Sequence, residues 1–349
     1  FFLNSNVYVN RGKKLKILHI SQFDDRNDYR LFNISISSKI SKGLIRNGHD
    51  VINFSYRNYI NKSIIHDRNR TINQKVLDIT NNYRPDLIIL GHNNFLYRNN
   101  IEILKSKFNC KISLWYEDAL GKKADGPHWR ENLSLIEANN DLIDTYFTTT
   151  HPDEIFTKIN KKKMTFLPIP VDENIENLKL YENKTNYKDF FFALSHGVNF
   201  GKLKKRKTDE REDFIKKLMN KFPRINYNIL GIANENPKWN YDYYKELSKC
   251  KIALNLSRGK PIKLTSSNRI ASLIGNGIYT FIDQKTQYDK VFDENEVGTY
   301  KSIDDLGNKV EFLLSNENKI KKYAKNGRDK YFKLFNSKVV SGKIINKTF

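Results

Sequence analysis

Short apolar runs alternate with helical patterns along the first half of the chain. The apolar runs, which are typical of buried strands, occupy residues 16–20, 51–55, 86–91, 111–115, 145–149 and 164–168. Between the first two runs, Phe32, Ile36, Ile40 and Leu44 recur every four residues and predict an amphipathic helix. Gly48 is expected to end this helix, because glycine is the usual stop residue. Strands that alternate with helices predict parallel βαβ units.

A second alternating series follows a polar, proline-containing stretch at residues 167–189. Its strand-like runs are at 190–194, 227–231, 251–256 and 278–283, and its helical patterns are at 212–222, 241–250 and 308–335. We therefore predict two α/β domains in one chain. The N-terminal domain spans residues 1–175 and the C-terminal domain spans 176–335. A helix or tail at 336–349 can return to the N-terminal domain.

The chain is strongly basic, with a formal net charge of +22 and a pI near 9.6 over 349 residues. Such a charge favours anionic partners such as phosphates, nucleic acid or an acidic membrane surface. The abundance of Lys and Asn is also typical of a chain coded by an AT-rich genome. Cys110 and Cys250 form no disulfide framework, and both lead into apolar strands, so we expect buried thiols. The chain shows no secretion signal or spanning helix, and we expect a cytoplasmic protein.

A basic loop follows the predicted strand at 190–194 and precedes a helix. We interpret this loop as an anion site, in which the backbone near Gly197 and Asn199 and the side chains of Lys205, Arg206 and Arg211 reach a diphosphate. A solvated basic loop is the alternative. The spacing of a Walker phosphate loop is absent.

The stretch LTSSNRIASLIGNG, residues 264–277, places several polar side chains at a helix start near Ser267. Ser and Thr are ordinary capping residues, so simple capping is one interpretation. Arg269 in the first turn opposes the helix dipole unless an anion binds nearby, which favours a phosphate or ribose site. The residues predicted to bind there, together with two on the same rim after the strand at 251–256, are Ser257, Arg258, Ser266, Ser267, Asn268, Arg269 and Ser272.

In the first half of the chain, polar residues that follow strands are candidates for acceptor binding, because ligands bind at the carboxyl ends of parallel strands. Glu117 and Asp118 come directly after a predicted strand, and either carboxylate could act as a general base or bind a hydroxyl. The other candidates are Gln22, His92 and His128. Each of these residues could instead be an ordinary polar loop residue. The sequence contains no zinc-ligand spacing, no Asp-x-Asp pair and no G-x-S-x-G motif.

Three segments resemble the GT-B glycosyltransferases, in particular the group 1 and spore-coat-type glycosyltransferase-like families. RNGHDVINF at 46–54 resembles the end of their first helix, and FLPIPVDENIE at 166–176 resembles their crossing between domains. Residues 243–331 resemble the order of strands and helices in their C-terminal domain. There is one departure. Related retaining enzymes carry two Glu residues eight positions apart, and the equivalent positions here are Leu264 and Ser272. Asn268, Arg269 or Ser272 would then substitute for them in part.

The resemblance implies a GT-B fold with two Rossmann-like, doubly wound parallel-sheet domains that face a central cleft. It further implies a nucleotide-sugar donor in the C-terminal domain, an acceptor in the N-terminal domain and catalysis without a metal or other cofactor. We therefore expect a glycosyltransferase acting on a glycan, lipid or protein hydroxyl. Arg211 and Arg269 would stabilise the leaving diphosphate. Asp118 would be the base in an inverting enzyme, or would position the acceptor in a retaining one.

Two other functions remain open. A nucleotide-sugar epimerase could use the same scaffold, because a fold does not determine a function. The charge and the aromatic content also suggest a nucleic-acid-binding protein, but the basic residues are dispersed and no recognised nucleic-acid motif is present. We expect no nucleic-acid partner. The basic surface could hold the protein on the inner face of a membrane.

Overall fold

The computed structural model describes residues 13–23, 29, 31–60, 68–92, 96–121, 129–184, 187–194, 209–232 and 235–349. The chain forms two compact units, Phe1–Asp172 with Phe335–Phe349, and Glu173–Leu334. They are called the N-terminal and C-terminal units below, and each is described by itself. The boundaries expected from the sequence were residues 175 and 335. None of the described helices is both long enough and apolar enough to cross a bilayer.

The N-terminal unit contains a six-stranded parallel sheet in the order β2-β1-β3-β4-β5-β6. All six strands predicted from the apolar runs are present. Their bounds are β1 Lys16–Ser21, β2 Asp50–Ser55, β3 Leu87–Gly91, β4 Lys111–Tyr116, β5 Thr145–Thr148 and β6 Met164–Phe166. The central strands β1, β3 and β4 are buried on both faces, which is why they read as continuous apolar runs rather than as alternating patterns.

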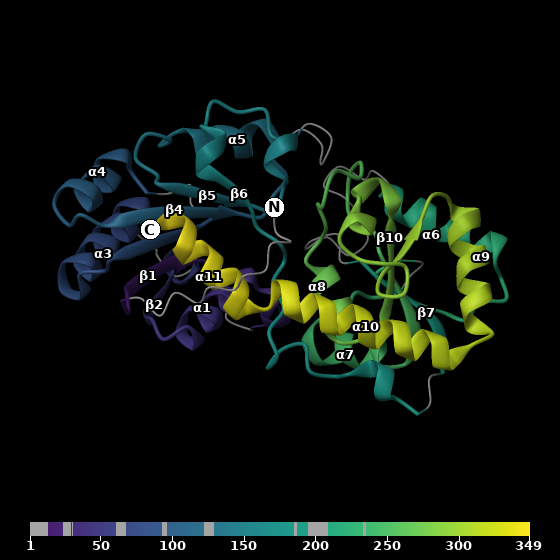
Figure 1. Cartoon of the computed structure of the whole chain (residues 1–349). Helices are drawn as coiled ribbons and strands as arrows, with labels where there is room; N and C mark the ends of the chain where they lie inside the picture. The colour runs from purple at the N-terminus through teal and green to yellow at the C-terminus, as the bar shows by residue number, and fades with distance from the viewer. Residues whose placement is uncertain are drawn as a thin grey trace. The chain divides into compact units, whose positions relative to one another are not determined.

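Helices cover both faces of this sheet (Figure 1). The helices on one face pack on a core that includes Leu18, Ile88 and Ile112; they are α3 Arg68–Tyr83, α4 Arg98–Ser106 and α5 Trp129–Glu137. The helices on the other face are α1 Ile36–Arg46 and α11 Ser337–Thr348, and a short α2 spans Arg57–Ile60. Short 3-10 helices in the two units occupy Phe32–Ile34, Pro152–Glu154, Lys161–Lys163, Leu180–Glu182, Gln284–Thr286 and Tyr288–Lys290.

Helix α1 shows how local sequence sets an element's limits. Ser35 caps its start, with the side-chain oxygen accepting from the Ser38 N–H at 3.2 Å. Gly48 follows its end with φ of 87°, so the predicted stop at this glycine is confirmed. The predicted helix was too long at its beginning, because Phe32–Ile34 form a separate 3-10 turn before the Ser35 cap.

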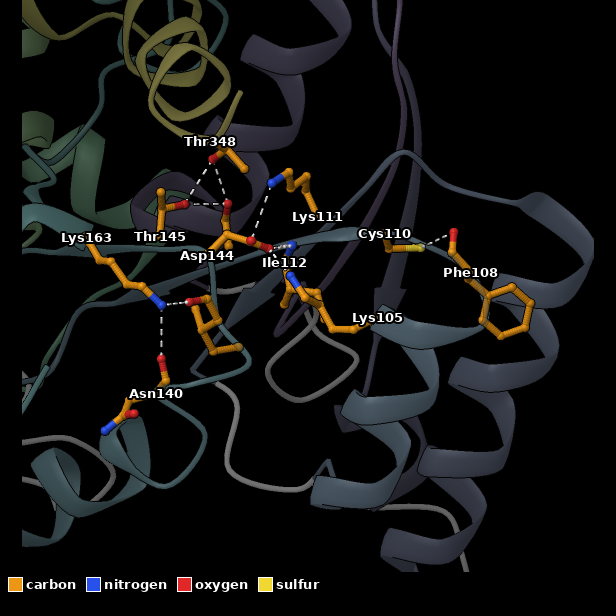
Figure 2. Close-up of polar contacts among 12 residues, drawn as sticks. Lys105, Phe108, Cys110, Lys111, Ile112, Asn140, Asp144, Thr145, Lys163 and Thr348 are labelled. Carbon is orange, nitrogen blue, oxygen red and sulfur yellow. Dashed lines mark hydrogen bonds and ion pairs between the residues drawn. The ribbon is translucent and has the colours of Figure 1, made fainter. Parts of the chain in front are cut away.

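Helix α11, yellow in Figure 1, packs against α1 although some 290 residues of sequence separate them. A side chain at Gly43 would collide with this helix, since its Cβ would lie 2.0 Å from the Ser337 carbonyl oxygen. Ser341 donates to the Ile40 carbonyl at 2.9 Å. At the other end of α11, the Thr348 hydroxyl lies 3.0 Å from that of Thr145 on β5 (Figure 2). Residues 335–349 are therefore part of the N-terminal unit.

A buried hydrogen-bonded chain ties β4, β1, α1 and β2 together. Trp115 Nε1 donates to His19 Nε2 at 3.0 Å, and His19 Nδ1 lies 2.8 Å from Ser41 Oγ. Ser41 in turn donates to Asn53 Oδ1 at 2.8 Å. His19 is fully buried, and burial lowers its pKa from 6.5 to about 3. The imidazole is therefore neutral in the folded protein, since Nε2 must accept a hydrogen bond.

We expect the free energy of unfolding to fall as the pH is lowered from 6.5 to about 5. In that window unfolded His19 takes up a proton and folded His19, with its pKa of about 3, does not. The slope is about 1.4 kcal/mol per pH unit, or about 2 kcal/mol over the window. Urea titrations at several pH values measure it, and His19→Gln should lose this part of the slope. Equal slopes in the two proteins would contradict the assignment of this pH dependence to His19.

The C-terminal unit contains a five-stranded parallel sheet in the order β11-β10-β9-β7-β8. Its strands are β7 Lys188–Ala193, β8 Tyr227–Leu230, β9 Cys250–Asn255, β10 Tyr279–Asp283 and β11 Gly298–Tyr300. The sequence predicted the first four and missed β11. Helices α6 Glu210–Lys221, α9 Ile303–Leu314 and α10 Glu317–Phe335 cover one face, and α7 Asn240–Leu247 and α8 Arg269–Gly275 cover the other. Both cysteines are buried free thiols, as predicted.

Candidate active site

The polar run at 264–268 is hydrogen-bonded to the carboxyl end of β9 and to the loop that follows it. Asn255, the last residue of that strand, is 2% exposed and donates to Ser266 Oγ at 2.7 Å. Ser267 Oγ donates to Asn255 Oδ1 at 3.0 Å, and the Ser267 N–H donates to Ser257 Oγ at 2.9 Å. The sequence suggested that these three hydroxyls contact a nucleotide-sugar. In the structure they instead hold the loop in place.

Helix α8 begins at Arg269, two residues later than the sequence suggested. Asn268 precedes it, and its side chain makes no capping bond. Ser272 has an exposed fraction of 0%, and its hydroxyl faces the phenol of Tyr243 on α7. Ser272 therefore does not reach the surface where a donor would bind, and it is not part of the site proposed below.

Arg269, a half-buried cation, lies at this carboxyl end of the sheet. Its Nη2 donates to the Leu256 carbonyl at 2.6 Å, and its Cζ lies 5.6 Å from the centre of the Phe192 ring. Its Nε is buried and has no hydrogen-bond partner among the described residues. Burial and, to a smaller extent, the charge of Arg211 lower the Arg269 pKa to about 10. The guanidinium is still protonated near pH 7, but its charge is poorly compensated.

Arg211 lies close enough to influence Arg269 but has a carboxylate partner. Asp209 caps α6 and accepts from Arg211 Nε at 2.9 Å and from Nη2 at 2.6 Å. The exposed fractions are 2% for Asp209 and 8% for Arg211. The sequence analysis missed Asp209, although an Asp directly before a helix is a common cap. Asp209 thus pairs with Arg211, and it acts on Arg269 only through its charge.

Most of the other predicted residues of the nucleotide-sugar site are not among those that the structure describes. Gly197, Asn199, Lys205 and Arg206 lie outside the described residues, as does His128 of the predicted acceptor site. Arg258 is exposed on the loop after β9. The neighbouring Gly259 N–H donates to Glu210 Oε1 on α6 at 2.9 Å, which holds this loop next to the start of that helix.

In the N-terminal unit, the structure brings three predicted acceptor residues together at the carboxyl ends of β3 and β4. His92 Nε2 accepts from the Glu117 N–H at 3.2 Å, and His92 Nδ1 lies 3.8 Å from Asp118 Oδ2. The imidazole stacks on Tyr116, with ring centres 4.4 Å apart. Because Nε2 accepts a hydrogen bond, the proton of the neutral ring is on Nδ1, the nitrogen that faces Asp118.

His92 adopts a backbone conformation that non-glycine residues rarely have, with φ of 53°. The Asp118 side chain is 62% exposed, so it can meet a substrate. Gln22, the remaining predicted acceptor residue, accepts from Arg57 Nη2 at 3.0 Å. Among the described residues, no group of three or more His, Cys, Asp and Glu is arranged to hold a metal ion.

Comparison with known proteins finds a family model that matches the C-terminal part of the chain. The model of the glycosyl transferase-like family matches residues 206–344. This match covers less than half of the chain and shows what its C-terminal part is similar to. The match covers the cap of α6, the start of α8 and α10, so Arg211 and Arg269 both lie within the glycosyl transferase-like segment. A search of curated protein sequences finds no significant match.

Solved structures with the same fold cover almost the whole chain. Alr3699/HepE of Anabaena, in complex with UDP and glucose, is 12% identical with a TM-score of 0.55, and the match covers 95% of this chain and 98% of that one. Sucrose-phosphate synthase of Thermosynechococcus elongatus is 12% identical with a TM-score of 0.57, covering 96% and 98%. A UDP-N-acetylglucosamine 2-epimerase is 8% identical with a TM-score of 0.50, covering 95% of both chains. These structures and the two parallel sheets show that the chain has a GT-B fold, and residues 206–344 are similar to the glycosyl transferase-like family.

Proposed function

We propose that the protein transfers a sugar from a nucleotide-sugar donor to an acceptor hydroxyl, and that the C-terminal unit holds the donor diphosphate at Arg269. The observation that carries this proposal is the half-buried Arg269 side chain, whose Nε is buried and has no hydrogen-bond partner among the described residues. Burying a cation without full compensation is costly, and its lowered pKa reflects that cost. A bound diphosphate would supply the missing negative charge.

The same charge arrangement suits the chemistry of the reaction. When the glycosidic bond to the donor breaks, the diphosphate oxygen gains negative charge. Arg269 is held by the Leu256 carbonyl and by the Phe192 ring, and Arg211 is held by Asp209. Fixed guanidinium groups stabilise developing charge without reorganising during the reaction. We therefore infer that transfer needs no metal ion, since these side chains provide the positive charge.

Ser257, Ser266 and Ser267 act mainly through the loop that they fix. Their hydroxyls bond to Asn255 or to the loop backbone, so they hold Arg269 at the strand end. In the N-terminal unit, Asp118 is the group that meets the acceptor hydroxyl. If transfer inverts the configuration at the anomeric carbon, Asp118 takes the proton of that hydroxyl directly. If transfer retains the configuration, Asp118 orients the hydroxyl.

A panel of nucleotide sugars tests the donor assignment by thermal shift. UDP-glucose is the first choice, because the neighbour HepE has been solved with UDP-glucose. The panel includes GDP-, ADP- and CMP-sugars, and a true donor at about 100 times its dissociation constant should stabilise the protein by about 2.7 kcal/mol. A chain that responds to none of the four classes does not fit the proposal.

An epimerase is the second candidate, since a UDP-N-acetylglucosamine 2-epimerase shares the fold at a TM-score of 0.50. The family match of residues 206–344 favours the transferase. Incubation with UDP-N-acetylglucosamine and no acceptor separates the two. An epimerase yields the C2 epimer of the sugar, and a transferase leaves that pool of nucleotide-sugar unepimerised.

A further inference from the structure

One aromatic side chain of the N-terminal unit projects into solvent. Phe156 is 94% exposed, more than any other large hydrophobic side chain in the described part of the chain. It lies between the 3-10 helices Pro152–Glu154 and Lys161–Lys163, in the connection from β5 to β6. Leaving a phenylalanine in water is unfavourable, so an exposed ring of this kind suggests a binding surface.

The backbone around Phe156 is fixed, so the ring cannot turn inward easily. Ile155 and Ile159 on either side are buried, at 2% and 3% exposure. Glu137 Oε1 on α5 accepts from Thr157 Oγ1 at 2.5 Å and from the Lys158 N–H at 2.9 Å. The two isoleucines and the carboxylate therefore anchor the loop and leave Phe156 outside it.

The surroundings of the ring are basic. Residues 152–163 contain four lysines against Asp153 and Glu154. Lys158 and Lys162 are exposed. Lys161 donates to the carbonyl groups of Pro152 and Ile155, and Lys163 donates to that of Asn140 at 3.2 Å (Figure 2). Carbonyl partners orient these two ammonium groups without cancelling their charge.

We propose that residues 152–163, the Phe156 loop, dock the protein on an anionic lipid bilayer. Phe156 enters the interface between headgroups and acyl chains, and Lys158 and Lys162 contact lipid phosphates. An apolar ring flanked by lysines suits such a surface, which offers an apolar layer beneath negative charge. A second copy of this chain is a less suitable partner for the loop, because two proteins with a net charge of +22 repel each other.

The residues that lead from β5 into the Phe156 loop are hydrogen-bonded to the loop that carries Asp118. Thr149 Oγ1 donates to the Glu117 carbonyl at 2.8 Å, and the Leu120 N–H donates to Thr150 Oγ1 at 3.2 Å. Docking would therefore bring the acceptor edge to the membrane. Where the proposed transferase function holds, on which this step rests, the acceptor is a hydroxyl borne by a membrane lipid.

Vesicle sedimentation tests the docking without donor or turnover. The full chain should bind vesicles of phosphatidylcholine with phosphatidylglycerol and should not bind phosphatidylcholine alone. Phe156→Ala should weaken the binding about tenfold, the lower end of what burying a phenylalanine gives. Lys158→Gln and Lys162→Gln should each weaken it about fivefold and reduce its salt dependence. Phe312→Ala, which removes a 67% exposed ring from the C-terminal unit, is the matched control and should bind like the parent.

A second readout follows insertion of the ring. Phe156→Trp should gain a blue-shifted emission component with anionic vesicles, after subtraction of the parent signal. The docking proposal is overturned if Phe156→Ala binds as the parent does, or if the parent does not bind anionic vesicles. It is also overturned if Phe156→Ala instead removes vesicle-independent self-association. Thermal shift with nucleotide sugars needs no vesicles, so failure of the docking and failure of the transferase function are seen separately.

Discussion

Replacing Arg269 with Gln is expected to remove the thermal stabilisation that a nucleotide-sugar donor gives. A charge-assisted hydrogen bond contributes about 1.5–3 kcal/mol, which corresponds to a roughly 10- to 150-fold weaker donor affinity without it. At a donor concentration that stabilises the parent by about 2.7 kcal/mol, a variant with 100-fold weaker affinity gains about 0.4 kcal/mol. The difference is readily measured by thermal shift.

The controls for this variant address folding and general charge. Arg269 also bonds to the Leu256 carbonyl, so circular dichroism must show that Arg269→Gln folds, and Arg269→Lys provides a second variant that keeps the charge. Arg224→Gln removes an exposed arginine just before β8, at the opposite edge of the same sheet. This control should respond to the donor like the parent. A folded Arg269→Gln protein with an undiminished donor response would refute the diphosphate assignment.

Asp118→Asn is expected to lower kcat/KM for the acceptor by about 10²–10⁴-fold, the range that a general base provides. The amide keeps the shape of the side chain but cannot take a proton. Donor binding should be unchanged in thermal shift, because Asp118 belongs to the N-terminal unit and the proposed diphosphate site belongs to the other. Initial rates with varied acceptor, at saturating donor, measure the effect.

The stereochemistry of the product decides whether the loss in kcat/KM comes from kcat or from the acceptor KM. If the enzyme inverts, the loss should fall in kcat; if it retains, the loss should fall mainly in the acceptor KM. Asp50→Asn is the matched control, because Asp50 is an exposed aspartate of the same unit at the start of β2, away from the carboxyl ends of the strands. Asp118→Asn with near-parental kcat/KM would exclude Asp118 from the acceptor site.

Most of the strands could be predicted because both sheets are parallel and their central strands are buried on both faces. Each strand is then an apolar run that stands out from the polar sequence around it. β11, Gly298–Tyr300, was missed because three residues give no pattern. The beginning of α1 was misplaced because Phe32 continues the helical spacing of the apolar residues, and only the Ser35 cap reveals where the helix starts.

The sequence predicted the edges of the sheets where polar residues gather, but not how those residues are used. Ser266 and Ser267 looked like ligand contacts because their partner Asn255 is distant in sequence and is brought near by folding. His92 and Glu117 were separate candidates until β3 and β4 proved to be neighbours. Contacts across strands depend on strand order, which composition and spacing do not determine.

The packing of α11 on α1 has a consequence for synthesis on the ribosome. Multidomain chains usually fold from the N-terminus onward as they emerge. Here residues 335–349, which complete the N-terminal unit, are translated after the entire stretch Glu173–Leu334. The C-terminal unit can therefore finish folding first. Until α11 has been synthesised, the face of α1 around Gly43 is exposed to solvent. A chain stalled before residue 335 would expose that face to chaperones and proteases.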